Sequence, residues 1–181
     1  MTRYGVPSPP MALPRSAFTI LELVAILAIV AILAVLAVPN FGRIIAAAQE
    51  ALCASKMRSI RLAIDSYLQD NSQIWPQGPR ADQPGWAPFW LDTLKPYGIT
   101  ESTWQCPAIR QLTRDQKLPP SLPVLHYVPT MFDATRGIAY RWPTQPWLIE
   151  AANAHGKGAL ICFPDGSVKP MDKVLAEQGI R

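Results

Sequence analysis

The sequence predicts an α+β fold, in which a long N-terminal helix packs on a small antiparallel β-sheet. Three features predict it: an apolar run at 18–38, a proline-free stretch at 40–75, and an apolar strand followed by turn residues within 159–170. Apart from Pro39, the prolines gather at 1–14 and 76–170. Because proline removes a hydrogen bond from a helix interior, this distribution divides the chain into a leader, a long helix and a loop-rich body.

The apolar run 18–38 reads FTILELVAILAIVAILAVLAV, and Glu22 is its only charged residue. A helix of this length spans about 31 Å, which matches the hydrocarbon core of a bilayer. Residues 1–17 contain Arg3 and Arg15 and no acid. By the positive-inside rule, the N-terminus then stays in the cytoplasm and the rest is exported. The sequence therefore predicts a transmembrane helix over 18–38.

Two simpler interpretations of this run are weaker. A secretory signal peptide has an apolar core of about 7–15 residues and a small-residue cleavage site, whereas this run is longer and ends in Val-Pro-Asn-Phe. A plain membrane anchor fits the length, and Glu22 near the cytoplasmic end could reach the interface. That interpretation gives Glu22 no role, although a charge inside a membrane segment is costly and usually functional.

The stretch Ser16–Val24, SAFTILELV, resembles the class III signal of type IV prepilins and type II secretion pseudopilins. The resemblance implies that prepilin peptidase cleaves between Ala17 and Phe18 and then N-methylates Phe18. Residues 1–17 would be the cleaved cytoplasmic leader. The chain departs from the family at Ala17, where glycine is usual.

Two further residues match the family's pattern and imply roles in assembly. Glu22 corresponds to the family's glutamate, which lies near the N-terminal amine of a neighbouring subunit in the filament. A buried carboxylate with such a partner is tolerated, whereas an unpaired one is costly. Pro39, 21 residues after Phe18, corresponds to a proline that bends the helix in many of these proteins.

Residues 39–71 are expected to continue the helix as an amphipathic segment that ends near Asp70–Asn71. One stripe at helical spacing predicts its buried face. Arg61 and Asp65 lie off the stripe and form an i, i+4 pair. The stripe could be a coiled-coil seam, but a face that packs on a globular domain is the more common case. It comprises Cys53, Met57, Ile60, Ile64 and Tyr67.

Residues 72–181 are expected to form a globular domain rich in loops and β-structure. Residues 72–147 combine many prolines with all six tryptophans, and they predict loops with short extended pieces such as Leu125–Pro129. The six tryptophans could form a platform for a carbohydrate or an aromatic ligand. We favour the alternative that their large rings build a small core.

A β-hairpin is expected at 159–170. Ala159–Phe163 is apolar, and the Pro-Asp-Gly sequence that follows is typical of a turn. His155, Asp165 and Gly166 resemble the H-X9-DG element of a large pilin-like subfamily. Cys106-Pro107 also resembles a Cys-Pro element that is common there.

The three cysteines allow at most one intrachain disulfide. The expected orientation places all of them outside the cytoplasm, where disulfides persist. Cys53 and Cys106 are the candidate pair, because the bond would join the loop-rich body to the helix. Cys162 lies in the apolar strand and is expected to be a buried thiol.

Catalysis, metal binding and cofactor binding are not predicted. The chain contains no HExxH, no CxxC and no calcium-loop pattern, so we expect neither a soluble nor a single-pass membrane enzyme. Nucleic acid is not an expected partner, because the net charge of +4 partly reflects the two leader arginines and there is no basic stripe with aromatic residues.

The resemblance thus implies a structural subunit of a type IV pilus or of a type II secretion pseudopilus. Its implied partners are prepilin peptidase, other pilin or pseudopilin subunits in a helical filament, an ATP-driven inner-membrane assembly platform, and membrane lipid. The expected location is the inner membrane, with the C-terminal domain outside the cytoplasm, and then the filament. The alternative is a membrane-anchored binding module that is exported by the prepilin route and displays a tryptophan-rich pocket.

Overall fold

A computed structural model describes residues 19–115, 117–118 and 125–179, without the side chains of residues 36–40. The expected leader, Ala17 and Phe18 lie outside the described residues, as does the side chain of Pro39. The chain divides into two compact units, Met1–Gly42 and Arg43–Arg181. We call them the N-terminal unit and the globular unit and describe each by itself.

The helix α1, Ile20–Asp70, is 51 residues long and contributes to both units. Thr19, the residue before the helix, caps it: its side-chain Oγ1 accepts a hydrogen bond from the Glu22 backbone N–H at 3.2 Å, as at many helix N-termini. The helix ends before Ser72 and Gln73, which have positive φ angles of 55° and 61°. A left-handed backbone is incompatible with a continuing helix, so the chain turns back here.

The expectation of a transmembrane helix at 18–38 is corrected by the structure. Among the described residues, no helix is both long enough and apolar enough to cross a membrane.

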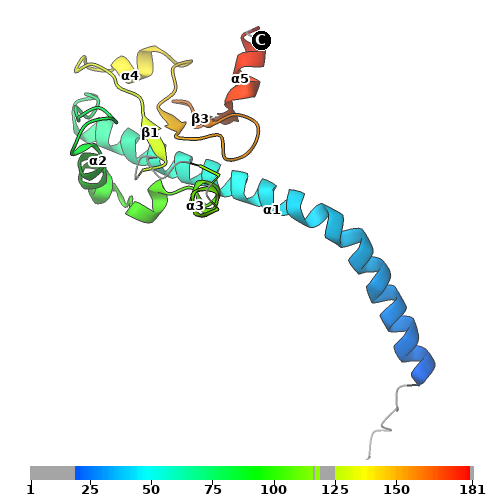
Figure 1. Cartoon of the computed structure of the whole chain (residues 1–181). Coiled ribbons are helices and arrows are strands. Elements are labelled where there is room, and N and C mark those ends of the chain that lie inside the picture. Colours follow the sequence, from blue (N-terminus) through cyan, green and yellow to red (C-terminus); the bar gives the residue numbers. More distant parts are fainter. Residues whose placement is uncertain (1–18, 116, 119–124, 180–181) are drawn as a thin grey trace, which may run out of the picture. The chain divides into compact units, whose positions relative to one another are not determined.

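The globular unit contains a four-stranded antiparallel sheet in the order β1-β2-β3-β4, which confirms the expected α+β class (Figure 1). The register pairs Val128 with Ile149, Ile149 with Ile161, and Ile161 with Lys169. β3 and β4 are joined by the turn at Asp165–Gly166. The strands are β1 Tyr127–Pro129, β2 Leu148–Glu150, β3 Leu160–Cys162 and β4 Val168–Pro170.

Short helices occupy much of the segment in which loops were expected. Proline occupies the first turn of both η1 and α3, where its missing N–H costs nothing and its fixed φ favours the helix. Proline therefore lies in the first turn of these helices, whereas the sequence analysis took the prolines of this segment as a sign of loops. The helices are α2 Trp86–Leu94, η1 Lys95–Tyr97, η2 Glu101–Trp104, α3 Pro107–Arg114, α4 Ile138–Arg141 and α5 Met171–Glu177.

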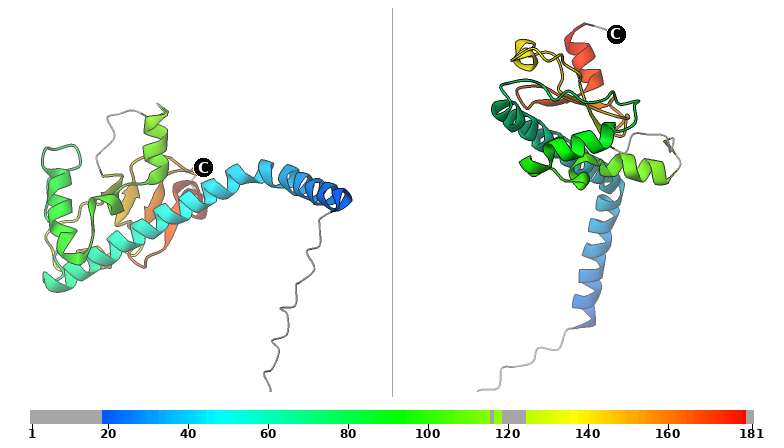
Figure 2. Two further views of the ribbon diagram at one scale, coloured as in Figure 1. Left: turned by 90° about the horizontal axis from the view of Figure 1, so that it is seen from below. Right: turned by 90° about the vertical axis from the view of Figure 1, so that its left-hand side faces the viewer.

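One face of α1 forms the centre of the globular core. Figure 2 shows the sheet, α2 and α3 gathered around this part of the helix. Leu68 is buried at the end of the stripe, whereas Tyr67, expected there from the sequence, is only half-buried. The fully buried members are Cys53, Met57, Ile60, Ile64 and Leu68.

Tryptophan rings fill the space between α1 and the rest of the core. Trp75, Trp104 and Trp147 are fully buried. The rings of Trp75 and Trp147 meet edge to face, with their centroids 5.4 Å apart, an arrangement that aromatic pairs prefer. Arg61, which is 3.9 Å from Asp65, also lies over the Trp147 ring at 5.4 Å. These three rings therefore belong to the core.

Two leucines on α1 give a matched test of this packing. Leu68 is fully buried, whereas Leu62 is 57% exposed. Leu68→Ala should lower the free energy of unfolding by about 2–5 kcal/mol, because it removes buried methyl groups and leaves a cavity. Leu62→Ala should change it by less than about 0.5 kcal/mol. Urea unfolding followed by tryptophan fluorescence measures both, and equal losses would contradict the assignment of the buried face.

Candidate functional site

The segment 155–166, which carries the H-X9-DG element, is attached to α1 at several points. The Lys157 ammonium lies 3.1 Å from Glu50 Oε2. The Arg58 guanidinium donates a hydrogen bond from Nε to the Gly166 carbonyl, at 3.3 Å. His155 lies beside Cys53, the first residue of the buried stripe. The element therefore fixes the loop before β3 and the β3–β4 turn to the helix.

The Asp-Gly end of the element forms the turn itself. The Asp165 carboxylate accepts a hydrogen bond from the Ser167 N–H at 2.8 Å. The Ser167 side chain, together with this backbone N–H, lowers the pKa of Asp165 below its usual range. Gly166 has a φ of 81°, in the left-handed region that favours glycine. Asp165 and Gly166 thus set the shape of the turn.

The histidine end belongs to a buried cluster of four side chains, Cys53, Cys106, Glu150 and His155. Each offers one donor atom, and the four atoms lie within 4.8 Å of one another. His155 Nε2 is 3.8 Å from Cys106 Sγ and 3.3 Å from Glu150 Oε1. Both cysteines are fully buried, and the side chains of His155 and Glu150 are 3% and 0% exposed.

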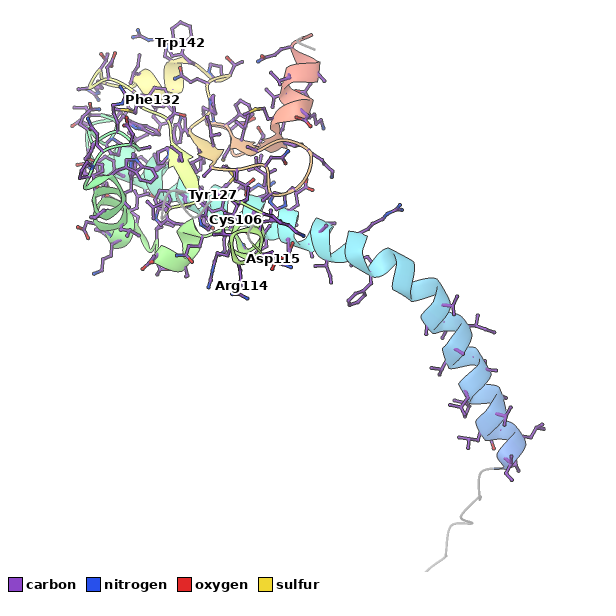
Figure 3. All side chains as sticks on the ribbon, viewed as in Figure 1. Cys106, Arg114, Asp115, Tyr127, Phe132 and Trp142 are labelled. Atoms are coloured by element: carbon purple, nitrogen blue, oxygen red, sulfur yellow. The ribbon has the colours of Figure 1, made fainter. Side chains whose placement is uncertain are left out.

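Four different segments supply this cluster. Cys53 comes from α1, and Cys106 is the residue before α3. Glu150 is the last residue of β2, paired with Tyr127 of β1, and His155 follows in the loop. Figure 3 shows Cys106 and Tyr127 beside α1. The cluster therefore forms only when α1, α3 and the sheet pack together.

Hydrogen bonds from the backbone orient two of the four residues. The Cys106 N–H donates to His126 Nδ1 at 3.0 Å, and burial lowers the pKa of His126. The Leu160 N–H donates to Glu150 Oε2 at 3.2 Å. The other carboxylate oxygen, Glu150 Oε1, has no hydrogen-bond partner within the described part of the chain.

The cluster changes the acidity of its own members. The neighbouring Cys106 thiol, which can donate a hydrogen bond, lowers the pKa of Cys53, and His155 lowers it further. Sharing that proton raises the pKa of Cys106 above its usual range. Cys53 and Glu150 together raise the pKa of His155 to about 10.

The structure brings together Cys53 and Cys106, which the sequence suggested as a pair, and His155, which the sequence singled out within the H-X9-DG element. Both cysteine thiols are free, and the expected disulfide between them stays a prediction. Glu150 was not singled out, and its only signal is an acid within the apolar stretch Trp147–Ala152. Cys162 lies in β3, where burial raises its pKa to about 11.

The cluster is not open to a substrate, because its side chains are buried. A cavity lined by aromatic side chains lies elsewhere, with a volume of about 390 Å³. Its lining includes Trp75, Trp86, Trp90 and Phe132, which are 1–9% exposed. Trp142, in contrast, is 54% exposed and lies away from the core (Figure 3).

Glu22 lies in the first turn of α1, in the N-terminal unit, and is exposed. It is not part of the cluster.

Comparisons with protein-family models, with curated proteins and with solved structures gave no match.

The turn of the H-X9-DG element can be tested by two glycine substitutions. An added Cβ would meet no atom within 4 Å at either Gly166 or Gly42, but only Gly166 has a positive φ. Gly166→Ala should therefore lower the free energy of unfolding by about 1 kcal/mol through backbone strain. Gly42→Ala, in a helical backbone, should not lower it. Thermal unfolding of both variants checks this, and an unchanged Gly166→Ala would count against a structural role for the turn.

Proposed function

We propose that the chain is a structural subunit of a helical filament of the type IV pilus or type II secretion pseudopilus class. The observation that carries the proposal is the apolar surface of the N-terminal unit. Eleven large apolar side chains between Ile20 and Val35 are 44–84% exposed. No described part of the chain covers them.

Burial of this surface supplies the driving force for assembly. A large apolar side chain gains about 1.5–3 kcal/mol when it moves from water to a packed interior. Contiguous exposed apolar surface of this kind marks an interaction site. Apolar residues lie on all sides of the helix between Ile20 and Val35, as expected for a helix that is surrounded by partners. Copies of the same helix in a filament core meet that requirement.

Glu22 sets the register between subunits. It is the only charged residue in the exposed apolar stretch, so packing of helices would bury a carboxylate. Cleavage by prepilin peptidase after Ala17 would create an N-terminal amine at Phe18, which can pair with Glu22 of a neighbouring subunit. A buried charge is tolerated when it is paired, so the pairing selects one axial offset.

The cavity beside Trp75 favours a second candidate, a binding module. Arg80 and Asp82 line the same cavity and are exposed, so a polar ligand could be recognised at its edge. The tryptophan rings themselves are 1–5% exposed. They offer little ring face for stacking, and for this reason we place the filament proposal first.

Substitution of Glu22 tests the filament proposal. Glu22→Ala should lower the yield of filaments released by shearing by more than about tenfold, because loss of a buried charge partner costs several kcal/mol. Asp92→Ala is the matched control, because Asp92 is an exposed acid of the globular unit. It should leave the yield unchanged. Electron microscopy and immunoblotting of the sheared fraction measure both.

Normal filaments from Glu22→Ala would refute the proposed role of Glu22. A wild-type protein that is processed but never found in sheared filaments would refute the filament function and favour the binding module.

A further inference from the structure

We propose that Cys53, Cys106, Glu150 and His155 bind one structural Zn²⁺ ion, which joins α1 to the rest of the globular unit. This site is independent of the filament function. It rests on the geometry of the cluster, on one oxygen that lacks a partner, and on the chemistry of the four donor atoms.

The distances within the cluster match a tetrahedral zinc site. Zn²⁺ binds sulfur at about 2.3 Å and nitrogen or carboxylate oxygen at about 2.0–2.2 Å. In a tetrahedron, these bond lengths place nitrogen and oxygen about 3.4 Å apart, and sulfur and nitrogen about 3.6 Å apart. The corresponding distances are 3.3 Å between His155 Nε2 and Glu150 Oε1, and 3.8 Å between His155 Nε2 and Cys106 Sγ.

The second observation is the unpartnered oxygen of Glu150. Oε1 is buried and accepts no hydrogen bond from the described residues, although His155 Nε2 is close to it. A buried carboxylate oxygen without a partner is costly. A metal ion held by the four donor atoms of the cluster, which lie within 4.8 Å of one another, would satisfy it.

The donor set selects Zn²⁺ over hard cations. Two sulfurs and one imidazole nitrogen suit a borderline-soft ion, whereas Ca²⁺ and Mg²⁺ require oxygen ligands. Four protein ligands complete the coordination, so the site has a structural rather than a catalytic form. The site lacks CxxC spacing because its ligands come from four separate segments.

Groups outside the cluster hold two of the proposed ligands in place, as in known zinc sites. The Leu160 N–H binds Glu150 Oε2, which leaves Oε1 for the metal. The Cys106 N–H binds His126 Nδ1. Each ligand is anchored in a different element, so bound Zn²⁺ would close long loops of the chain and stabilise the folded state.

The test uses the full chain, purified under reducing conditions and freed of metal with a chelator. Titration with Co²⁺ reports thiolate ligands through an intense charge-transfer band, and subsequent Zn²⁺ should remove the band. The wild type should bind one equivalent of either metal, measured by elemental analysis. Zn²⁺ should raise its thermal unfolding midpoint by several degrees, because the ion binds only the folded state.

Three variants identify the ligands. Cys106→Ser and Glu150→Gln should lower metal affinity at least tenfold. Cys162→Ser is the matched control, because Cys162 is an equally buried cysteine that lies outside the cluster. It should keep the stoichiometry and the band.

A second measurement keeps the proposal testable if the ligand variants do not fold. In the wild type, Zn²⁺ should protect Cys53 and Cys106 from alkylation, as detected by peptide mass mapping. Absence of a cobalt–thiolate band in the folded, reduced wild type would overturn the proposal. So would a Cys53–Cys106 disulfide in protein isolated from its native compartment, because it would occupy both sulfurs.

Discussion

The packing of one face of α1 against the globular core is the interaction on which the other features depend. Ile60, Ile64 and Leu68 have no exposed surface, and the tryptophan-rich core is assembled on them. The loop before β3 and the β3–β4 turn are fixed to the same helix by the contacts of Glu50 and Arg58. Without the packing of this face of α1, neither the sheet nor the buried cluster would be held in place.

The two parts of α1 differ in whether their apolar side chains are buried. The buried side chains stabilise the fold, and the exposed ones are available for assembly. In the globular unit, α1 has one buried apolar face, on which Ile60, Ile64 and Leu68 are covered by the chain's own residues. In the N-terminal unit, the apolar side chains are exposed. Apolar surface that a chain does not cover itself is available to a partner. This contrast, together with Glu22, supports our proposal that subunits assemble through the first part of α1.

Some of this structure could be predicted from the sequence and some could not. Helical spacing from Cys53 to Ile64 identifies the buried face, because periodicity directly reflects which side of a helix is covered. The helix α3 was missed because Pro107 resembles an interruption, although proline is favourable in a first turn. The cluster of His155 and Glu150 could not be predicted, since no local pattern encodes contacts between segments so far apart. The expected transmembrane helix was wrong for the described residues.

The central claim is that the chain becomes a filament subunit after removal of a leader, and the mature N-terminus tests it most directly. Mass spectrometry of the protein isolated from cells should find a chain that begins at N-methylated Phe18 and lacks residues 1–17. This terminus supplies the amine that Glu22 is proposed to pair with. A mature protein that keeps Met1, or that begins at any residue other than methylated Phe18, would contradict the account.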